Sequence, residues 1–151
     1  MYRSILTYCV LLALPLYGQG RTDSVAEKNK GKSVSINVGL NMMMRGFNRI
    51  ILKDEYAQIN LRSMRTNLKT WPVWDTNRFS TNFIGHPYHG SMYFNSARTN
   101  GLGFYQSSVV SMAGSLMWEY LMETKPPSQN DLWATTIGGT ALGETLFRFS
   151  D

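Results

Sequence analysis

The chain has 151 residues, of which 43% are hydrophobic and 17% are charged, and this balance predicts one folded domain rather than a disordered polar chain or a multi-span membrane protein. Lysine and arginine number 15 against 10 acidic residues, and the net charge of +5 is spread along the chain, which argues against a dedicated polyanion-binding arm. One cysteine and two histidines exclude a disulfide scaffold and a cysteine-rich zinc module.

Residues 1–20 have the organisation of a secretory signal peptide. Arg3 supplies the positive charge, residues 5–16 form a short apolar run, and residues 18–20 offer small side chains at a cleavage site. The run is shorter than the roughly 20 residues of a membrane-spanning helix, and an uncleaved anchor is the alternative. Cleavage after Gly20 removes Cys9 and leaves a thiol-free chain, which suits an oxidising compartment such as a periplasm.

The mature chain is expected to begin with a flexible polar leader over residues 21–33, followed by a helical domain over residues 34–151. Apolar residues recur at helical spacing from Leu40 to Ile51. A second helix is predicted over residues 55–68, and Trp71-Pro72 ends it because a residue before proline avoids helical backbone angles. Residues 74–89 are rich in aromatic and asparagine residues and predict an ordered loop.

The second half of the chain predicts further helices. A short helix over residues 90–99 ends at Asn100-Gly101. The longest, over residues 104–124, carries a narrow apolar stripe opposite a side that is rich in serine. Ser128 and Asp131 resemble a capping box at the start of the next helix. The final helix, over residues 139–149, begins with Gly139 and Gly143, whose spacing allows another helix to approach closely.

The expected fold is therefore mostly α, a small helical bundle with an ordered loop rich in aromatic and asparagine residues. Its longest helix, residues 104–124, contains serines, Gln106 and Glu119, which make it a poor lipid-facing span. Its side of small polar residues is nevertheless typical of helices that pack closely in membranes. A membrane-associated bundle is therefore the alternative.

Both histidines lie in the motif His86-Pro87-Tyr88-His89-Gly90. Two histidines three residues apart can ligate a metal when a carboxylate completes the site, and Glu119 is the candidate for that third ligand. In the alternative interpretation, Pro87 shapes the loop and the histidines donate hydrogen bonds to the backbone.

Glu119 and Glu123 are candidate catalytic carboxylates, together with His86, His89 and Glu144. A partly buried carboxylate needs a cation or hydrogen-bond donors to offset its desolvation, and Arg98, Arg148, a histidine or a metal would serve. The alternative is a structural carboxylate–arginine network that holds helices together.

Three further residues are candidates for binding. Arg98 has the geometry to clamp an anionic group with two hydrogen bonds, or to pair with Glu119 or Asp131. Tyr93 lies on the same predicted short helix. Asp131 has a capping role that already explains its presence.

Taken together, these motifs resemble the bacterial domain of unknown function 3943, over about residues 56–151. The matching features are Trp74-Asp75 with Phe79 and Asn82, the His86–Gly90 motif, Tyr93-Phe94 with Ala97-Arg98, Asn100-Gly101, Trp118-Glu119-Tyr120 with Glu123, Pro127-Ser128 with Asn130-Asp131, Gly138-Gly139, and Gly143-Glu144. The resemblance implies an envelope protein of Bacteroidetes or other Gram-negative bacteria, exported and associated with the outer membrane. It implies no activity. Members are usually longer and continue into a region rich in predicted strands, so this chain is expected to be a short or truncated member.

No Walker loop, dinucleotide fingerprint, nucleophile elbow or zinc-protease helix is present. We therefore expect a structural or partner-docking module of the periplasm or outer membrane, without a cofactor, whose partner is the membrane or an outer-membrane protein. The alternative is a metal-dependent hydrolase or lipid-modifying enzyme, in which a divalent metal is held by His86 and His89 with Glu119 or Glu123. Nucleic-acid binding is not expected, because the basic residues form no stripe and the chain is predicted to be exported.

Overall fold

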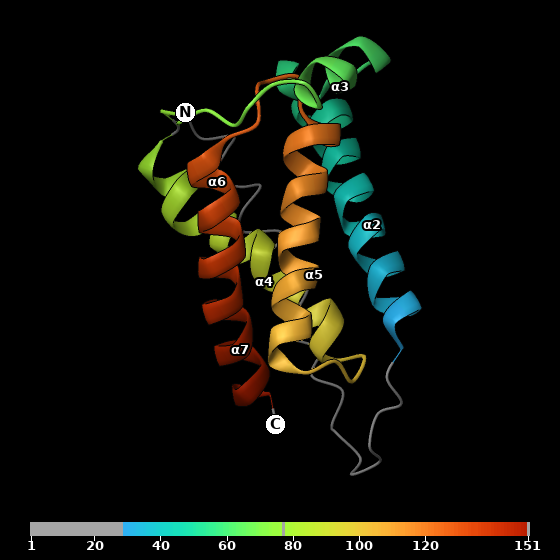
Figure 1. Cartoon of the computed structure of the whole chain (residues 1–151), viewed down its shortest axis with the longest axis vertical. Coiled ribbons are helices and arrows are strands. Elements are labelled where there is room, and N and C mark those ends of the chain that lie inside the picture. Colours follow the sequence, from blue (N-terminus) through green and yellow to red (C-terminus); the bar gives the residue numbers. More distant parts are fainter. Residues whose placement is uncertain (1–28, 77, 151) are drawn as a thin grey trace.

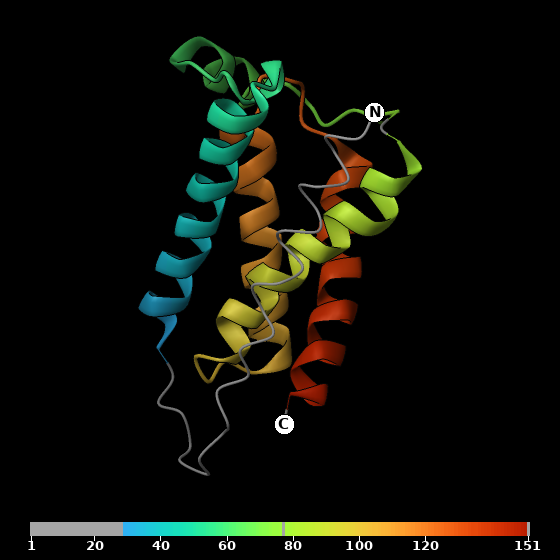
Figure 2. The same cartoon turned by 180° about the vertical axis from the view of Figure 1, so that it is seen from behind.

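The computed structural model describes residues 29–76 and 78–150 as a helical bundle. Helices α2 (Lys30–Phe47), α5 (Phe104–Met117) and α7 (Gly139–Phe149) run roughly side by side (Figure 1). Helix α4 (His86–Arg98) crosses them obliquely and is most visible from behind (Figure 2). It packs against α7, α5 and α2, so it is the central element of the fold. The expected mostly helical class is confirmed.

Short π-helical segments extend or join the α-helices. Segment η1 (Asn48–Leu52) continues α2, and η4 (Trp118–Met122) continues α5. Segment η3 (Thr81–Gly85) leads into α4, and η5 (Ala134–Gly138) joins α6 (Gln129–Trp133) to α7. A 3-10 turn, η2 (Glu55–Ala57), and helix α3 (Leu61–Asn67) lie between α2 and the bundle's second half. Single π turns inside helices are often found at functional sites.

Several predicted boundaries move. The helix expected over residues 55–68 is broken at Asn60, whose side chain accepts a hydrogen bond from the Ser63 amide and caps α3. The expected loop over residues 74–89 is helical from residue 79 onward, through η3 and into α4, whose first turn contains Pro87. In the described part of the predicted leader, Asn29 caps α2 and residues 30–33 are helical. The predicted signal peptide lies outside the described residues.

Glycines let α4, α5 and α7 approach closely. A Cβ atom added to Gly90 would lie 1.8 Å from the Thr135 carbonyl oxygen, and one added to Gly139 would lie 2.4 Å from the Gly90 Cα. On Gly143 a Cβ would lie 2.7 Å from the Phe94 ring, and on Gly114 2.7 Å from the Tyr93 ring. The close approach predicted for Gly139 and Gly143 is confirmed.

The interior of the bundle is unusually polar. Around Tyr93 and Phe94, the helices bury serine and asparagine side chains, among them Ser33, Asn37, Asn41, Ser107, Ser111 and Ser115. The apolar stripe of α5 faces outward instead, so that Val109 is 59% exposed and Leu116 39% exposed. Within residues 29–76 and 78–150, no helix has both the length and the apolar character that a bilayer crossing requires.

Candidate functional site

The fold brings His86 to the start of the chain's last helical segment. His86 is the first residue of α4, and Asp131 lies in the short helix α6. Ser128 caps α6, because its hydroxyl accepts a hydrogen bond from the Asp131 amide. The His86 Nε2 atom is 3.4 Å from the Asp131 Oδ2 atom, and its Nδ1 atom is 3.1 Å from the Thr135 hydroxyl. Both ring nitrogens therefore face polar groups of the α6–η5 segment.

Glu119 reaches the same place from η4. Its side chain is buried, and its Oε2 atom accepts a 2.8 Å hydrogen bond from the Ser128 amide. Burial is the largest of the effects that raise the pKa of Glu119 to about 9, and repulsion by the charge of Glu123 is the second. The charges of Asp131 and Asp75 act in the same direction. Glu119 is thus surrounded by other carboxylates, which disfavour its ionised form.

Glu123 ends η4 close to this group. The Trp118 indole N–H donates a hydrogen bond to the Glu123 carboxylate, and burial raises the pKa of Glu123, while the charge of His86 opposes this shift. The Asn67 amide donates to the carbonyl oxygens of Glu119, Glu123 and Lys125, at 3.4, 2.9 and 2.8 Å. These bonds fix the C-terminal end of η4, where backbone carbonyls lack helical partners.

One ligand atom each from His86, Glu119 and Asp131 lie within 4.8 Å of one another. We call this group the His–Glu–Asp cluster. Its members come from α4, η4 and α6, so only the packed bundle assembles them. The candidate metal set of His86, His89 and Glu119 therefore changes in one position, because Asp131 takes the place expected for His89.

His89 points into the bundle instead. Its Nε2 atom is 2.7 Å from the Tyr93 hydroxyl, which donates a 2.7 Å hydrogen bond to the Asn41 side-chain oxygen Oδ1. Because the hydroxyl proton is used on Asn41, we assign the ring proton of His89 to Nε2. Asn41 donates to Asn37, whose amide donates to the Val110 carbonyl oxygen. This buried chain of hydrogen bonds ties α4 to α2 and α5.

His89 is therefore expected to control stability in acid. Burial, followed by the charge of His86, lowers its pKa from 6.5 to about 3. The neutral form belongs to the fold, so its contribution is complete above pH 6.5 and is lost as the pH falls toward 3. Between pH 7 and pH 4, this loss is about 3 kcal/mol.

Urea denaturation at several pH values measures that loss. The matched variant is His89→Gln, whose amide can still donate to the Tyr93 hydroxyl but does not titrate. We expect the variant to lose less stability than the parent chain between pH 7 and pH 4. Parallel pH profiles for the two proteins would contradict this prediction, because protonation of His89 would then not lower the free energy of unfolding.

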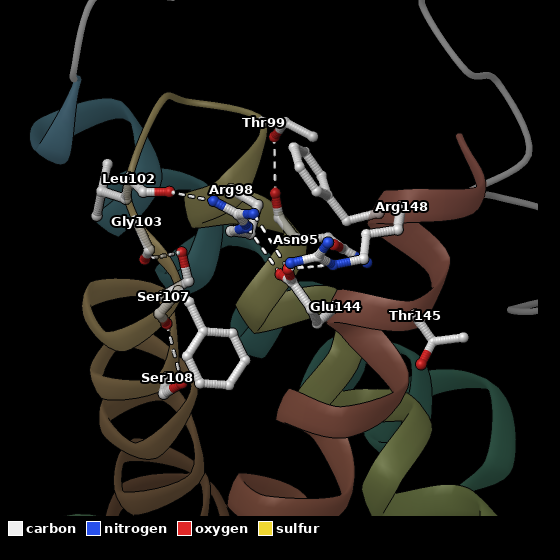
Figure 3. A network of polar contacts seen from close by, with 12 residues as sticks. Asn95, Arg98, Thr99, Leu102, Gly103, Ser107, Ser108, Glu144, Thr145 and Arg148 are labelled. Atoms are coloured by element: carbon white, nitrogen blue, oxygen red, sulfur yellow. Dashed lines mark hydrogen bonds and ion pairs between the residues drawn. The ribbon is translucent and has the colours of Figure 1, made fainter. Parts of the chain in front are cut away.

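Arg98 lies at the other end of α4, about 18 Å from His86 along the helix axis. Its Nε and Nη2 atoms donate to the two carboxylate oxygens of Glu144, at 2.9 and 3.2 Å (Figure 3). Nη1 donates to the Leu102 carbonyl oxygen at 3.1 Å, and the guanidinium lies 4.3 Å from the centre of the Phe147 ring. The expected pairing of Arg98 with Glu119 or Asp131 is wrong, because α7 presents Glu144 to it instead.

The candidate residues thus fall into three places. His86, Glu119, Glu123 and Asp131 gather at one end of the bundle, Arg98 and Glu144 pair at the other, and His89 and Tyr93 are buried between α4 and α2. Tyr93 has no exposed surface, so it is not accessible as a binding residue in this conformation.

Sequence reasoning missed Thr135, Asn41 and Asn67. Asn37 and Asn41, at helical i and i+4 spacing, are a sequence sign of a polar buried face, as is the serine-rich side of the helix over residues 104–124.

A known sequence family covers the second half of the chain. The sequence model of a domain of unknown function (DUF3943) matches residues 71–151, and this segment contains every member of the His–Glu–Asp cluster. No curated protein and no solved structure matches the chain. Because the matched segment covers more than half of its residues, the chain belongs to the DUF3943 domain family.

Proposed function

We propose that this chain is an exported, structural module in the cell envelope of a Gram-negative bacterium. In the periplasm, it docks onto the outer membrane or another lipid bilayer that borders this compartment. The observation that carries the proposal is the reversed polarity of the bundle. Helices of water-soluble proteins bury their apolar face, whereas here α2 and α5 bury serine and asparagine and expose apolar side chains. An exterior of this kind is stabilised by an apolar environment.

The exposed apolar side chains lie on several elements rather than in one patch. They include Val34, Met42, Met43, Ile50, Ile51, Trp71, Trp74, Phe79, Phe83, Val109, Met112, Ile137 and Phe149. A groove of about 370 Å³, lined mostly by apolar atoms, lies between α5 and the η5–α7 segment at Phe104, Ile137 and Ala141. A single protein partner would cover one face, so surface of this extent favours lipid as the occupant.

The distribution of charge favours anionic lipid. Residues 30–69 contain eight basic and two acidic residues, whereas residues 70–150 contain four basic and five acidic residues. Basic residues beside apolar and tryptophan side chains are the combination found on proteins that lie in the headgroup region of a bilayer. Trp71 is 83% exposed and Trp74 is 73% exposed, just after the basic part of the chain.

Flotation with lipid vesicles tests the proposal. We expect the full chain to float with vesicles of phosphatidylcholine and phosphatidylglycerol in equal parts, and less with phosphatidylcholine alone. The combined variant Val109→Gln, Met112→Gln and Leu116→Gln removes three exposed apolar side chains of α5. At about 1 kcal/mol for each half-exposed side chain, it should lower vesicle partitioning about 100-fold.

The control is Ala113→Gln, which adds the same amide to an exposed position of α5 while removing little apolar surface. It should float like the parent chain, and circular dichroism should show that all variants are helical. Equal flotation of the parent and the triple variant would contradict lipid docking. A chain that stays with the aqueous fraction as a defined oligomer would instead identify a second copy as the occupant.

A second candidate function is the metal-dependent hydrolase or lipid-modifying enzyme. One observation favours it, namely the convergence of His86, Glu119 and Asp131. Such an enzyme needs an open coordination position for its substrate. The side chains of His86 and Asp131 are only 12% and 5% exposed, so the geometry supports a buried, structural role better than a catalytic one.

A further inference from the structure

We propose that the His–Glu–Asp cluster is a binding site for one divalent transition-metal cation, Zn²⁺ or Mn²⁺, which ties α4, η4 and α6 together. This proposal does not depend on lipid docking. It rests on the geometry, the hydrogen bonds and the charges of His86, Glu119 and Asp131.

The donor atoms have suitable types and spacing. Imidazole nitrogen with two carboxylate oxygens suits zinc or manganese better than calcium or copper. Two donors bound to one tetrahedral zinc ion, each about 2.1 Å from it, lie about 3.4 Å apart. His86 Nε2 and Asp131 Oδ2 are 3.4 Å apart, and the Glu119 donor lies within 4.8 Å of both. Binding of an ion would draw the Glu119 carboxylate closer and complete the three-ligand set.

Each of the three side chains also meets a hydrogen-bonding group from outside the cluster. The Thr135 hydroxyl lies at His86 Nδ1, the Asn130 amide donates to Asp131 Oδ1 at 3.0 Å, and the Ser128 amide donates to Glu119 Oε2. Metal-bound histidine commonly donates its other ring N–H to an oxygen atom, and metal-bound carboxylates are similarly oriented. With an ion bound at His86 Nε2, the ring proton would lie on Nδ1, facing the Thr135 hydroxyl.

The local charge would be offset by a bound cation, in addition to Lys125, whose charge already acts on Glu123. Four carboxylates, of Glu119, Glu123, Asp131 and Asp75, influence one another in this part of the bundle. Arg98 and Arg148 are engaged by Glu144 at the opposite end of α4. A divalent ion would offset the repulsion between Glu119 and Asp131. The low exposure of the His86 and Asp131 side chains, 12% and 5%, favours a structural role for the ion.

The test is a metal titration of the full chain after dialysis against a chelator. We expect one equivalent of Zn²⁺ or Mn²⁺ by isothermal titration calorimetry and native mass spectrometry, together with a higher melting temperature. The variants Asp131→Asn and His86→Gln should lose this stoichiometric binding. Thr135→Val, which removes only the partner of His86 Nδ1, should weaken it about 10- to 100-fold.

The matched control is Glu144→Gln, which also neutralises a mostly buried carboxylate but lies outside the cluster. It should bind one equivalent as the parent chain does, even if its melting temperature falls. Circular dichroism identifies any variant that does not fold, in which case Thr135→Val decides. The proposal is overturned if the folded parent chain binds neither metal, or if Asp131→Asn and Thr135→Val bind as tightly as the parent.

Discussion

Gly90→Ala should destabilise the bundle by about 3 kcal/mol or more, which is at the upper end of what overpacking costs. The added methyl carbon would lie 1.8 Å from the Thr135 carbonyl oxygen and 2.9 Å from the Gly139 Cα. These are backbone atoms, so no side-chain rotation relieves the contact and α4 must move away from the η5–α7 segment. Gly139→Ala meets Gly90 from the other side and should have a similar effect. Urea or thermal denaturation in detergent measures both.

Gly39→Ala is the control for these variants. Gly39 lies in α2 and is exposed, and a Cβ atom there meets nothing within 4 Å. Because alanine favours a helix more than glycine does, this change should stabilise the protein by about 0.5–1 kcal/mol. If Gly90→Ala and Gly39→Ala changed the free energy of unfolding equally, α4 and α7 would not be in backbone contact.

Arg98→Ala should destabilise the protein by about 3 kcal/mol, near the lower end of the cost of removing one partner from a buried ion pair. The change removes both bonds to Glu144, the bond to the Leu102 carbonyl oxygen and the stacking on Phe147. Glu144 keeps the partner Arg148, which is why a larger loss is not expected. Arg98→Lys should recover only part of the loss, since an ammonium cannot form the paired bonds.

Arg148→Ala provides the matched comparison, because Arg148 donates to the same carboxylate from a side chain that is 75% exposed. Solvent screening makes such a bond worth at most about 0.5 kcal/mol. Denaturation of the two alanine variants side by side therefore separates the buried pair from the exposed one. Equal losses would mean that the burial of Arg98 contributes nothing to the strength of its ion pair.

Lipid docking and metal binding concern different parts of the molecule. The exposed side chains of α2 and α5 would meet the bilayer, whereas the His–Glu–Asp cluster lies inside the bundle between α4, η4 and α6. A metal at that point would fix the short α6 helix and η4, which are joined by only a few residues around Pro127. The ion would then maintain the shape of the module that the apolar exterior anchors.

Local patterns in the sequence determined the helices and several of their ends. Helical spacing and Ser128 as a cap are both local signals, because capping acts within one helical turn. The break at Asn60 and the helical start of α4 were missed. In both places a capping or first-turn role lay within residues that a periodicity analysis assigns to a longer helix or to a loop.

Tertiary structure alone decided which face of each helix is buried and which polar residues meet. Periodicity shows that α5 has an apolar and a serine-rich side, but the buried side depends on what surrounds the bundle, and here the small serine side packs inward. His86 reaches Asp131, and Arg98 reaches Glu144, across more than forty residues. Such pairings depend on the packing of whole helices around Gly90 and Gly139, and sequence spacing carries no information about contacts at that separation.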